Sequence, residues 1–225
     1  MRTLAIGDIH GCYNALAALE AYVAFEAEDR IITLGDYVDR GPGTKQVLEW
    51  LIHRDSVGNL VALRGNHELM MIAARDSKFD FEDWFACGGS AVLDSYEVSN
   101  LDELPDKHWD FLLSRLLPYY ETKTHFFVHA NASPDLPLPE QPEFMLYWEQ
   151  FDDPPPHESG RTMICGHTSQ RSGKPLDVGH ATCIDTSACR GGWLTCLDVD
   201  TRFCWQANES GDIRCFWLNE GPSDP

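Results

Sequence analysis

Five short strings in this chain place Asp, His or Asn where apolar runs end, and in four of them the residue stands next to glycine. G-D-I-H-G covers residues 7–11, G-D-Y-V-D-R-G covers 35–41 and G-N-H-E covers 65–68, and the later strings are V-H-A at 128–130 and G-H-T at 166–168. Apolar runs that end in glycine turns are typical of β-strand ends, and an α/β protein gathers its site at the carboxyl edge of its sheet. The pattern therefore predicts an α/β (α+β) fold whose polar residues meet at one sheet edge.

The first third of the chain alternates strand and helix patterns. Strands are predicted over residues 4–6, 31–34 and 60–63, and helices over residues 12–25 and 44–53. This βαβαβ order indicates parallel strands joined by crossover helices.

The rest of the chain changes character twice. We expect a mostly helical, cap-like segment at residues 67–117, which would shape the mouth of the site, and a Pro- and acid-rich surface loop at 131–160. Further strands are predicted at 124–129, 163–165, 181–184, 193–199, 202–206 and 213–218. The later ones, separated by short polar turns, are interpreted as hairpins. No composition shift divides the chain, so residues 1–225 are expected to form a single domain.

Charge limits the partners of this chain. It carries 17 basic and 36 acidic residues, a formal net charge of −19. Such a surface repels nucleic acid, so no nucleic-acid partner is expected. It also gives no long-range attraction for anionic substrates, so any phosphate must be captured by local positive charge, such as bound dications and a few arginines.

The N-terminus and the cysteines favour a reducing compartment. The first motif begins at residue 7, which leaves no room for a signal peptide, and no apolar stretch reaches membrane-spanning length. We therefore expect a cytoplasmic protein with no membrane partner. The eight cysteines form no C-x-x-C pair, which argues against a zinc ribbon. A disulfide among Cys196, Cys204 and Cys215, on neighbouring predicted strands, is a disfavoured alternative.

The first two motifs carry carboxylates and a histidine at spacings that suit a metal ion. Asp8 and His10 stand two residues apart, which on an extended segment puts both side chains on one face. Asp36 and Asp39 share a short turn, where two carboxylates repel unless cations or hydrogen bonds compensate. The alternatives are ordinary: Asp8 as a helix cap, and an Asp-rich turn at 36–39. If metals bind, Asp36 suits a bridging role and Asp39 suits orienting a catalytic group.

The other three motifs offer single ligands. Asn66 is a weaker ligand through its amide oxygen, and on an extended backbone the adjacent His67 would point elsewhere and serve another purpose. His129 and His167 each follow a predicted strand. A lone histidine is more often structural than ligating, so these residues remain open when considered one at a time.

Taken together and in this order, the motifs resemble those of the calcineurin-like metallophosphoesterases. More narrowly, they are similar to the PPP-type phosphoprotein phosphatases, in the compact form typified by the bacteriophage lambda and bacterial serine/threonine phosphatases. The resemblance extends to W-F-A-C-G-G at residues 84–89, I-D-T at 184–186 and G-W-L-T at 192–195. It implies a central β-sandwich flanked by helices.

The resemblance also implies a role for each motif residue. Two divalent metal ions are expected, Mn²⁺ first, with Fe or Zn²⁺ suiting the same mixed ligands. Their ligands would be Asp8, His10, Asp36 as the bridge, Asn66, His129 and His167. His67 would be the general acid, hydrogen-bonded to Asp39. Arg40 and Arg64, with Asn66, would hold the phosphate.

The activity that the resemblance implies is a protein phosphatase. It would hydrolyse phosphoserine and phosphothreonine, and by extension phosphotyrosine, by direct attack of a hydroxide that bridges the two metals. The expected partner is thus a phosphoprotein or phosphopeptide. One alternative is a hydrolase of dinucleoside polyphosphates such as diadenosine tetraphosphate. Relatives of that type tend to have Gln at the position of His10 and Trp after the last motif histidine, so His10 and Thr168 favour the protein phosphatase. A catalytically silent binding module is the alternative from another class.

One position departs from the family pattern. Gln150 stands where lambda-like relatives have an arginine that helps to bind phosphate. Arg161, Arg171 and Arg190 are candidates to replace it.

Overall fold

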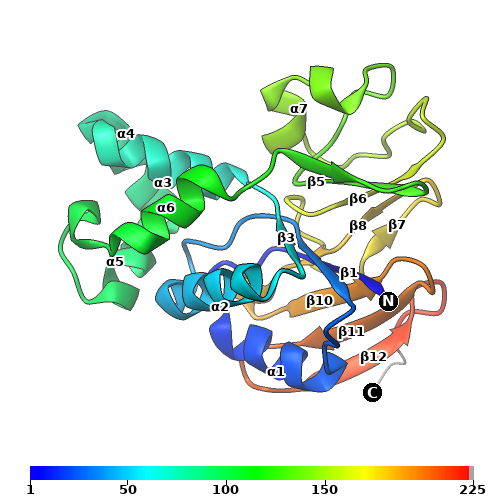
Figure 1. The fold of residues 1–225 in the computed structure, drawn as a ribbon, viewed down its shortest axis with the longest axis horizontal. Coiled ribbons are helices and arrows are strands. Elements are labelled where there is room, and N and C mark those ends of the chain that lie inside the picture. The colour runs from blue at the N-terminus through cyan, green and yellow to red at the C-terminus, as the bar shows by residue number, and fades with distance from the viewer. Residues whose placement is uncertain (223–225) are drawn as a thin grey trace.

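Two β-sheets face each other in the computed structural model, which describes residues 1–222 (Figure 1). The first sheet has the strand order β12-β11-β10-β1-β2-β3, with β9 also paired to β10. The second has the order β4-β5-β6-β8-β7. Helices flank these mixed sheets, which confirms the predicted fold class. No helix within residues 1–222 is long and apolar enough to cross a membrane.

The predicted βαβαβ unit forms half of the first sheet. Strands β1 (Thr3–Ile6), β2 (Arg30–Thr33) and β3 (Leu60–Ala62) are parallel. Helices α1 (Tyr13–Val23) and α2 (Thr44–Val57) connect them. The other half is antiparallel and consists of β9 (Asp185–Thr186), β10 (Trp193–Asp198), β11 (Phe203–Ala207) and β12 (Ile213–Trp217). Strand β10 pairs antiparallel with β1, so the C-terminal hairpins complete the sheet that the N-terminus begins.

The second sheet corrects the prediction of late hairpins. Its strands are β4 (Tyr119–Glu121), β5 (His125–Val128), β6 (Thr162–Cys165), β7 (Leu176–Asp177) and β8 (Ala181–Cys183). Strand β6 runs parallel to both β5 and β8, so residues 163–165 and 181–184 are not a hairpin pair. The connections between these strands are long enough for a crossover, as parallel pairing requires. Strands β4, β7 and β9 were not predicted, and unlike the equally short β3 and β8 they contain few apolar residues.

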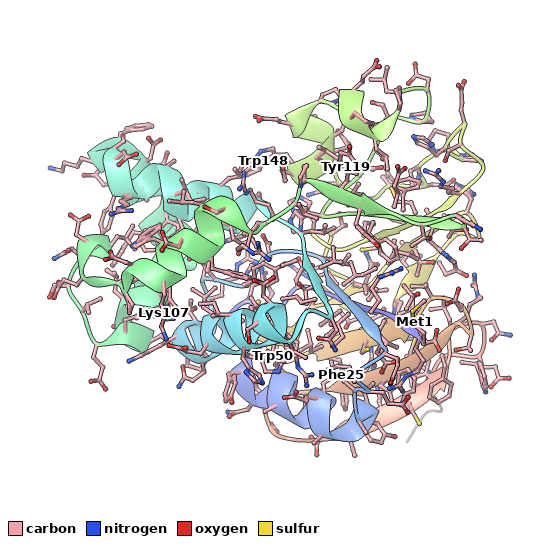
Figure 2. The ribbon with its side chains drawn as sticks, in the orientation of Figure 1. Met1, Phe25, Trp50, Lys107, Tyr119 and Trp148 are labelled. Carbon is pink, nitrogen blue, oxygen red and sulfur yellow. The ribbon has the colours of Figure 1, made fainter. Side chains whose placement is uncertain are left out.

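Alternating side chains divide the apolar core into layers. On β1, Leu4 and Ile6 pack toward the helices, whereas Ala5 packs between the sheets with Phe127 and Ile164 of the second sheet. This is the period-two alternation of a strand covered on both faces. The side chains of Phe25 and Trp50, labelled in Figure 2, meet beside α1 and α2 with ring centroids 6.5 Å apart.

The segment at 67–117 is helical, as its pattern indicates. It contains α3 (Asn66–Asp76), α4 (Lys78–Trp84), α5 (Ser90–Tyr96) and α6 (Asp106–Ser114), which group at one end of the molecule (Figure 1). A π-helical turn, Phe85–Gly89, joins α4 to α5. The loop at 131–160 contains a 3₁₀ turn, Leu138–Glu140, and a short α-helix, α7 (Glu143–Tyr147). All eight cysteines are free thiols.

Candidate active site

The motif residues meet because the strands that precede them end at neighbouring positions of the two sheets. Five of these residues have a left-handed backbone, with positive φ at His10, Asp36, Asp39, Arg40 and His167. Such conformations are strained for residues other than glycine, and they cluster where the surrounding structure fixes a functional site. The strain therefore marks the same residues as the sequence motifs.

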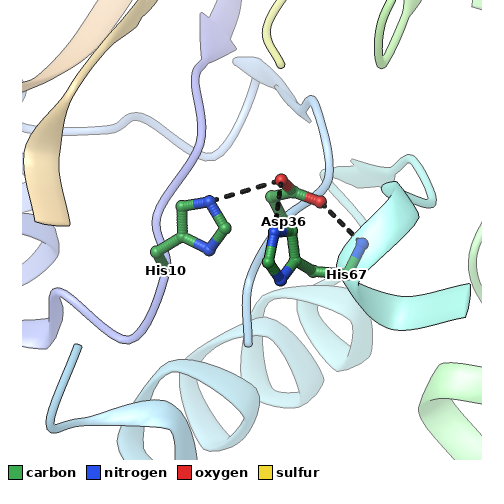
Figure 3. Close-up of side chains that lie close together, drawn as sticks. All are labelled: His10, Asp36 and His67. Carbon is green, nitrogen blue, oxygen red and sulfur yellow. Dashed lines mark hydrogen bonds and ion pairs between the residues drawn. The ribbon is translucent and has the colours of Figure 1, made fainter. Parts of the chain in front are cut away.

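Asp36 stands at the centre of the site, with its two oxygens facing different histidines. Its Oδ2 lies 3.3 Å from His10 Nε2, and its Oδ1 lies 3.4 Å from His129 Nε2. Figure 3 shows the rings of His10 and His67 approaching the same carboxylate oxygen, Oδ2, with His67 Nε2 at 4.0 Å. Burial raises the pKa of Asp36, but the charges of the surrounding imidazoles outweigh burial and hold it well below its usual value. Asp36 thus stays ionised and is placed to serve two ligand groups at once.

The second ligand group consists of Asp36, Asn66, His129 and His167. The Nδ1–H of His129 donates to the Leu34 carbonyl (2.8 Å), which leaves the Nε2 lone pair facing Asn66 Oδ1 at 3.0 Å. His167 donates Nε2–H to the Trp148 carbonyl (3.3 Å), and its Nδ1 faces the same amide oxygen at 3.1 Å. With these tautomers, lone pairs converge without a proton between them. A cation satisfies that arrangement, so these residues fit a divalent metal ion.

The first ligand group differs from the predicted one. The Nδ1–H of His10 donates to the Val38 carbonyl (2.9 Å), so its Nε2 faces Asp36 as a ligand would. The carboxylate of Asp8 instead accepts the backbone N–H of His167 at 3.0 and 3.1 Å. Burial and the charges of Asp185 and Asp36 raise the pKa of Asp8 well above its usual value. The ligand role of Asp8 therefore stays a prediction, whereas the structure gathers the other four predicted ligands, His10, Asn66, His129 and His167, around Asp36.

The prediction of an extended backbone at Asn66 and His67 was wrong. Both residues lie in the first turn of α3, where side chains splay in different directions from the helix start. Asn66 consequently turns toward His129 and His167, while His67 turns toward Asp39. The division of roles expected for the two residues is thus produced by helical rather than extended geometry.

His67 is held by a buried carboxylate and an arginine. Its Nδ1–H donates to Asp39 Oδ2 at 2.6 Å, and the indole N–H of Trp84 donates to the other oxygen at 2.8 Å. On the far side of the ring, Arg40 donates to His67 Nε2 at 2.8 Å and to His10 Nε2 at 2.7 Å. A ring that a carboxylate fixes at Nδ1 can transfer a proton at Nε2 once Arg40 releases that nitrogen.

Glu68 is a site residue that the motif analysis passed over. It is fully buried and its two oxygens accept the backbone N–H groups of Asp36, Tyr37, Val38 and Gly65. These bonds clamp the loop that carries Asp36 against the start of α3. Burial, followed by the charge of Asp36, raises the pKa of Glu68 to about 7. The available signal was a Glu three residues after the residue that caps α3, which is the spacing of a capping box.

The two predicted phosphate-binding arginines have different surroundings. Arg40 contacts His10 and His67, as described above. Arg64 precedes Gly65, the residue that caps α3, and its Nε is buried without a hydrogen-bond partner in residues 1–222. A buried donor with no partner is costly unless a ligand completes it. Gln150 offers its backbone oxygen to the Asn131 side chain, and Arg161 pairs with Glu121.

Comparisons with known proteins agree on the family. The model of the calcineurin-like phosphoesterase family matches residues 1–181. A symmetrical bis(5'-nucleosyl)-tetraphosphatase of Klebsiella pneumoniae is 45% identical, with 88% of this chain and 91% of the relative covered. Proteins of the same name from Pseudomonas fluorescens and Methylobacillus flagellatus are 33% and 39% identical over 61% and 34% of this chain. The chain spans less than half the length of these two relatives, 46% and 27%.

Solved structures show the same fold at low identity. A structure assigned provisionally as a diadenosine tetraphosphatase has a TM-score of 0.64 and 20% identity, with 99% of this chain and 94% of that chain covered. A cold-active protein tyrosine phosphatase has a TM-score of 0.65 and 16% identity, with 99% and 80% covered.

The Klebsiella pneumoniae relative overturns the expected phosphoprotein partner, because it is named for a dinucleoside tetraphosphate substrate. The choice of a phosphoprotein over a dinucleoside polyphosphate rested on His10 and Thr168. His10 faces Asp36 in the metal-type group and the Thr168 hydroxyl accepts the Phe151 backbone N–H, so neither contact distinguishes one phosphate substrate from another. The matched family model and the ligand groups around Asp36 together identify the chain as a member of the calcineurin-like phosphoesterase family, a metallophosphoesterase hydrolase.

Proposed function

We propose that this chain hydrolyses dinucleoside tetraphosphates, such as diadenosine tetraphosphate, with the help of two divalent metal ions. The observation that carries the proposal is the similarity to the Klebsiella pneumoniae tetraphosphatase, which extends over most of both chains. Symmetrical cleavage of such a substrate gives two nucleoside diphosphates. This proposal replaces the protein phosphatase predicted from the motifs with the alternative prediction, a hydrolase of dinucleoside polyphosphates.

The residues around Asp36 would hold the ions. His10 would bind on one side of the Asp36 carboxylate, and Asn66, His129 and His167 would bind on the other. We retain Asp8 as a ligand of the first ion, reached by a turn of its carboxylate away from the His167 backbone. Carboxylate, imidazole and amide ligands suit Mn²⁺, with Fe and Zn²⁺ as the alternatives. When bound, such a pair would activate a water molecule near neutral pH and neutralise charge on the phosphoryl group.

The protein's own residues would bind the phosphate and move a proton. Arg40 would exchange its contacts with His10 and His67 for phosphate oxygens, and Arg64 would bring its unpaired Nε to the same group. Guanidinium groups suit this task because their planar fork matches two phosphate oxygens. With Arg40 drawn to the phosphate, His67 Nε2 would face the leaving oxygen while Asp39 held the ring.

The leaving group of a dinucleoside tetraphosphate differs from that of a phosphomonoester in its need for a proton. An alkoxide that leaves a phosphomonoester needs a proton, whereas a leaving nucleoside diphosphate ends in a phosphate with a pKa of about 6. Proton donation by His67 therefore matters less for a phosphoanhydride. The site must instead neutralise a long anionic chain, on a molecule whose formal net charge is −19.

The test is a product analysis on the full chain loaded with Mn²⁺. Diadenosine tetraphosphate is incubated with the protein, and nucleotides are separated by ion-exchange chromatography, with p-nitrophenyl phosphate and a phosphopeptide panel as comparison substrates. We expect ADP as the sole nucleotide product, at a kcat/KM well above that for any phosphopeptide. Turnover of p-nitrophenyl phosphate without turnover of diadenosine tetraphosphate would contradict the proposal, and inactivity on all substrates would favour a silent binding module.

A further inference from the structure

A second basic cavity lies beside the candidate active site. It has a volume of about 320 Å³ and is lined by Arg171, Ser187, Arg190, Gly191 and Gly192. None of these residues belongs to the motifs that gather around Asp36. Two arginines in one small cavity are unexpected in so acidic a chain, so the cavity requires an explanation.

The arginines of this cavity stand out when all twelve in the chain are compared. Six form ion pairs with carboxylates. Arg30 and Arg214 lie over the rings of Tyr120 and Trp193. Among residues 1–222, the four with neither kind of partner are Arg40, Arg64, Arg171 and Arg190. Two of the four belong to the candidate active site, and the other two line this cavity.

The cavity is joined to the active site by two short segments. Arg171 lies four residues after His167, and Arg190 directly follows Cys189 in a 3₁₀ turn, Ala188–Arg190. Burial raises the pKa of the Cys189 thiol, and the nearby Arg40 guanidinium opposes that effect. The Cys189 thiol therefore lies near both Arg40 and Arg190, so the cavity is close to an anion that Arg40 would bind.

The cavity also has a buried polar group without a partner. Ser187 is 6% exposed, and its hydroxyl has no hydrogen-bond partner within the described residues 1–222. Its backbone is left-handed, with a φ of 64°, and its N–H is tied to Asp185 Oδ1 at 2.9 Å. A Cβ on Gly192 would come within 2.3 Å of the Thr186 carbonyl, so the chain must have glycine there. A fixed, unpaired hydroxyl beside two unpaired guanidinium groups fits an anionic oxygen.

We propose that Arg171, Arg190 and the Ser187 hydroxyl form a second phosphate subsite, which binds a phosphate of the substrate's polyphosphate chain beyond the one held by Arg40 and Arg64. This inference rests on the proposed function, and it explains how the site would recognise a chain of phosphates rather than a single phosphate. Two separate phosphate-binding subsites would fix which phosphoanhydride bond lies at Asp36. The subsite thereby determines where the chain is cut.

The experiment compares the double variant Arg171→Gln/Arg190→Gln with wild type and with Arg161→Gln. The last is a matched control, because Arg161 pairs with Glu121. Loss of an arginine–phosphate contact corresponds to roughly 10- to 100-fold in affinity. We expect the double variant to lose about that factor in kcat/KM for diadenosine tetraphosphate, mainly through KM, and to release ATP and AMP beside ADP. Its kinetics on p-nitrophenyl phosphate, which has one phosphate, should match wild type.

A second measurement does not depend on the identity of the substrate. Inorganic tripolyphosphate and orthophosphate are compared as inhibitors of p-nitrophenyl phosphate hydrolysis at constant free Mn²⁺, and as stabilisers in thermal melts. Wild type and Arg161→Gln should bind tripolyphosphate at least tenfold more tightly than orthophosphate. At about 100 times its Kd, tripolyphosphate should raise Tm by roughly 5 °C or more. The double variant should lose the tenfold preference.

The outcomes separate the two proposals. If wild type shows the preference for tripolyphosphate but does not cleave diadenosine tetraphosphate, the proposed function fails and the subsite stands. Equal affinity of wild type for the two inhibitors overturns the subsite. So does an equal loss of activity on both substrates in the double variant, because that would place the arginines at the scissile phosphate itself.

Discussion

Replacement of Asp39 by Asn tests the proton-transfer role of His67 through a single atom. Asp39 accepts Trp84 Nε1–H with one oxygen and His67 Nδ1–H with the other. The indole nitrogen only donates, so the amide oxygen of the variant must stay with Trp84, and its NH₂ group must face His67. The doubly protonated ring that a general acid requires would then meet a donor at Nδ1. Asparagine tolerates the left-handed φ of 69° at this position, so the backbone itself is not strained.

The size of the effect follows from the two contacts that change. The lost charge-assisted hydrogen bond contributes about 1.5–3 kcal/mol, and the unmatched pair of donors costs about 1–3 kcal/mol more. Together these amount to roughly 10²–10⁴ in rate wherever His67 must donate a proton. Stability should change little, because burial raises the pKa of Asp39 and thus opposes its charge in the folded state.

The assay measures kcat on glycerol phosphate and on diadenosine tetraphosphate, with Tm as a control. For Asp39→Asn we expect a fall of roughly 10²–10⁴ on glycerol phosphate, less than about tenfold on the anhydride, and a Tm within a few degrees of wild type. Trp84→Phe should show the opposite pattern: a lower Tm, and a fall on glycerol phosphate of less than about tenfold, because His67 keeps its carboxylate. Equal falls of Asp39→Asn on both substrates would refute the reasoning.

Three further predictions concern the surroundings of the site and the fold. Glu68→Gln turns an NH₂ group toward backbone N–H donors of the Asp36 loop, which can no longer all be satisfied. Mn²⁺ affinity, measured by calorimetry, should therefore fall about 10- to 100-fold. An unchanged affinity would show that Glu68 does not hold the Asp36 loop in place for metal binding. Gly166→Ala brings a methyl group within 2.0 Å of Asp8 Oδ1, which should cost about 1–3 kcal/mol in urea unfolding and would be contradicted by an unchanged midpoint. Burial lowers the pKa of His108 below 6.5, so below that pH the unfolded chain binds a proton that the folded chain does not. Stability from this group is complete above pH 6.5 and is lost as the pH falls through the lowered pKa; His108→Asn should flatten that slope in urea titrations, and an identical slope would contradict the assignment.

The sequence located the candidate residues best where they lie at or just after the end of a strand. His129 and His167 are positioned by strand ends, which periodicity and glycine turns reveal. It failed where the chain reverses direction. His10 has a φ of 45°, so the expected extended spacing with Asp8 does not hold, and Asp8 turns to the backbone of His167 instead.

Contacts between segments that are distant in the sequence could not be predicted from local sequence patterns. Trp84 donates to Asp39 from 45 residues away, and Glu68 gathers backbone groups from a different loop. Such contacts depend on how helices pack over a sheet edge, which single-sequence periodicity does not encode. The substrate prediction failed for a related reason: the motif residues are proposed to hold only the reacting phosphate, whereas Arg171 and Arg190, which line the neighbouring cavity, lie outside the motifs.

Metal content of Asp36→Asn is the most direct test of the central claim, that one carboxylate serves two ligand groups. Elemental analysis and Mn²⁺ titration are performed on wild type, on this variant and on Asp198→Asn, a buried aspartate of β10 outside the site. We predict two ions per chain for wild type and for Asp198→Asn. In Asp36→Asn both affinities should fall together, because each oxygen of Asp36 faces a different histidine. Loss of a single ion, with the other bound at wild-type affinity, would contradict the account.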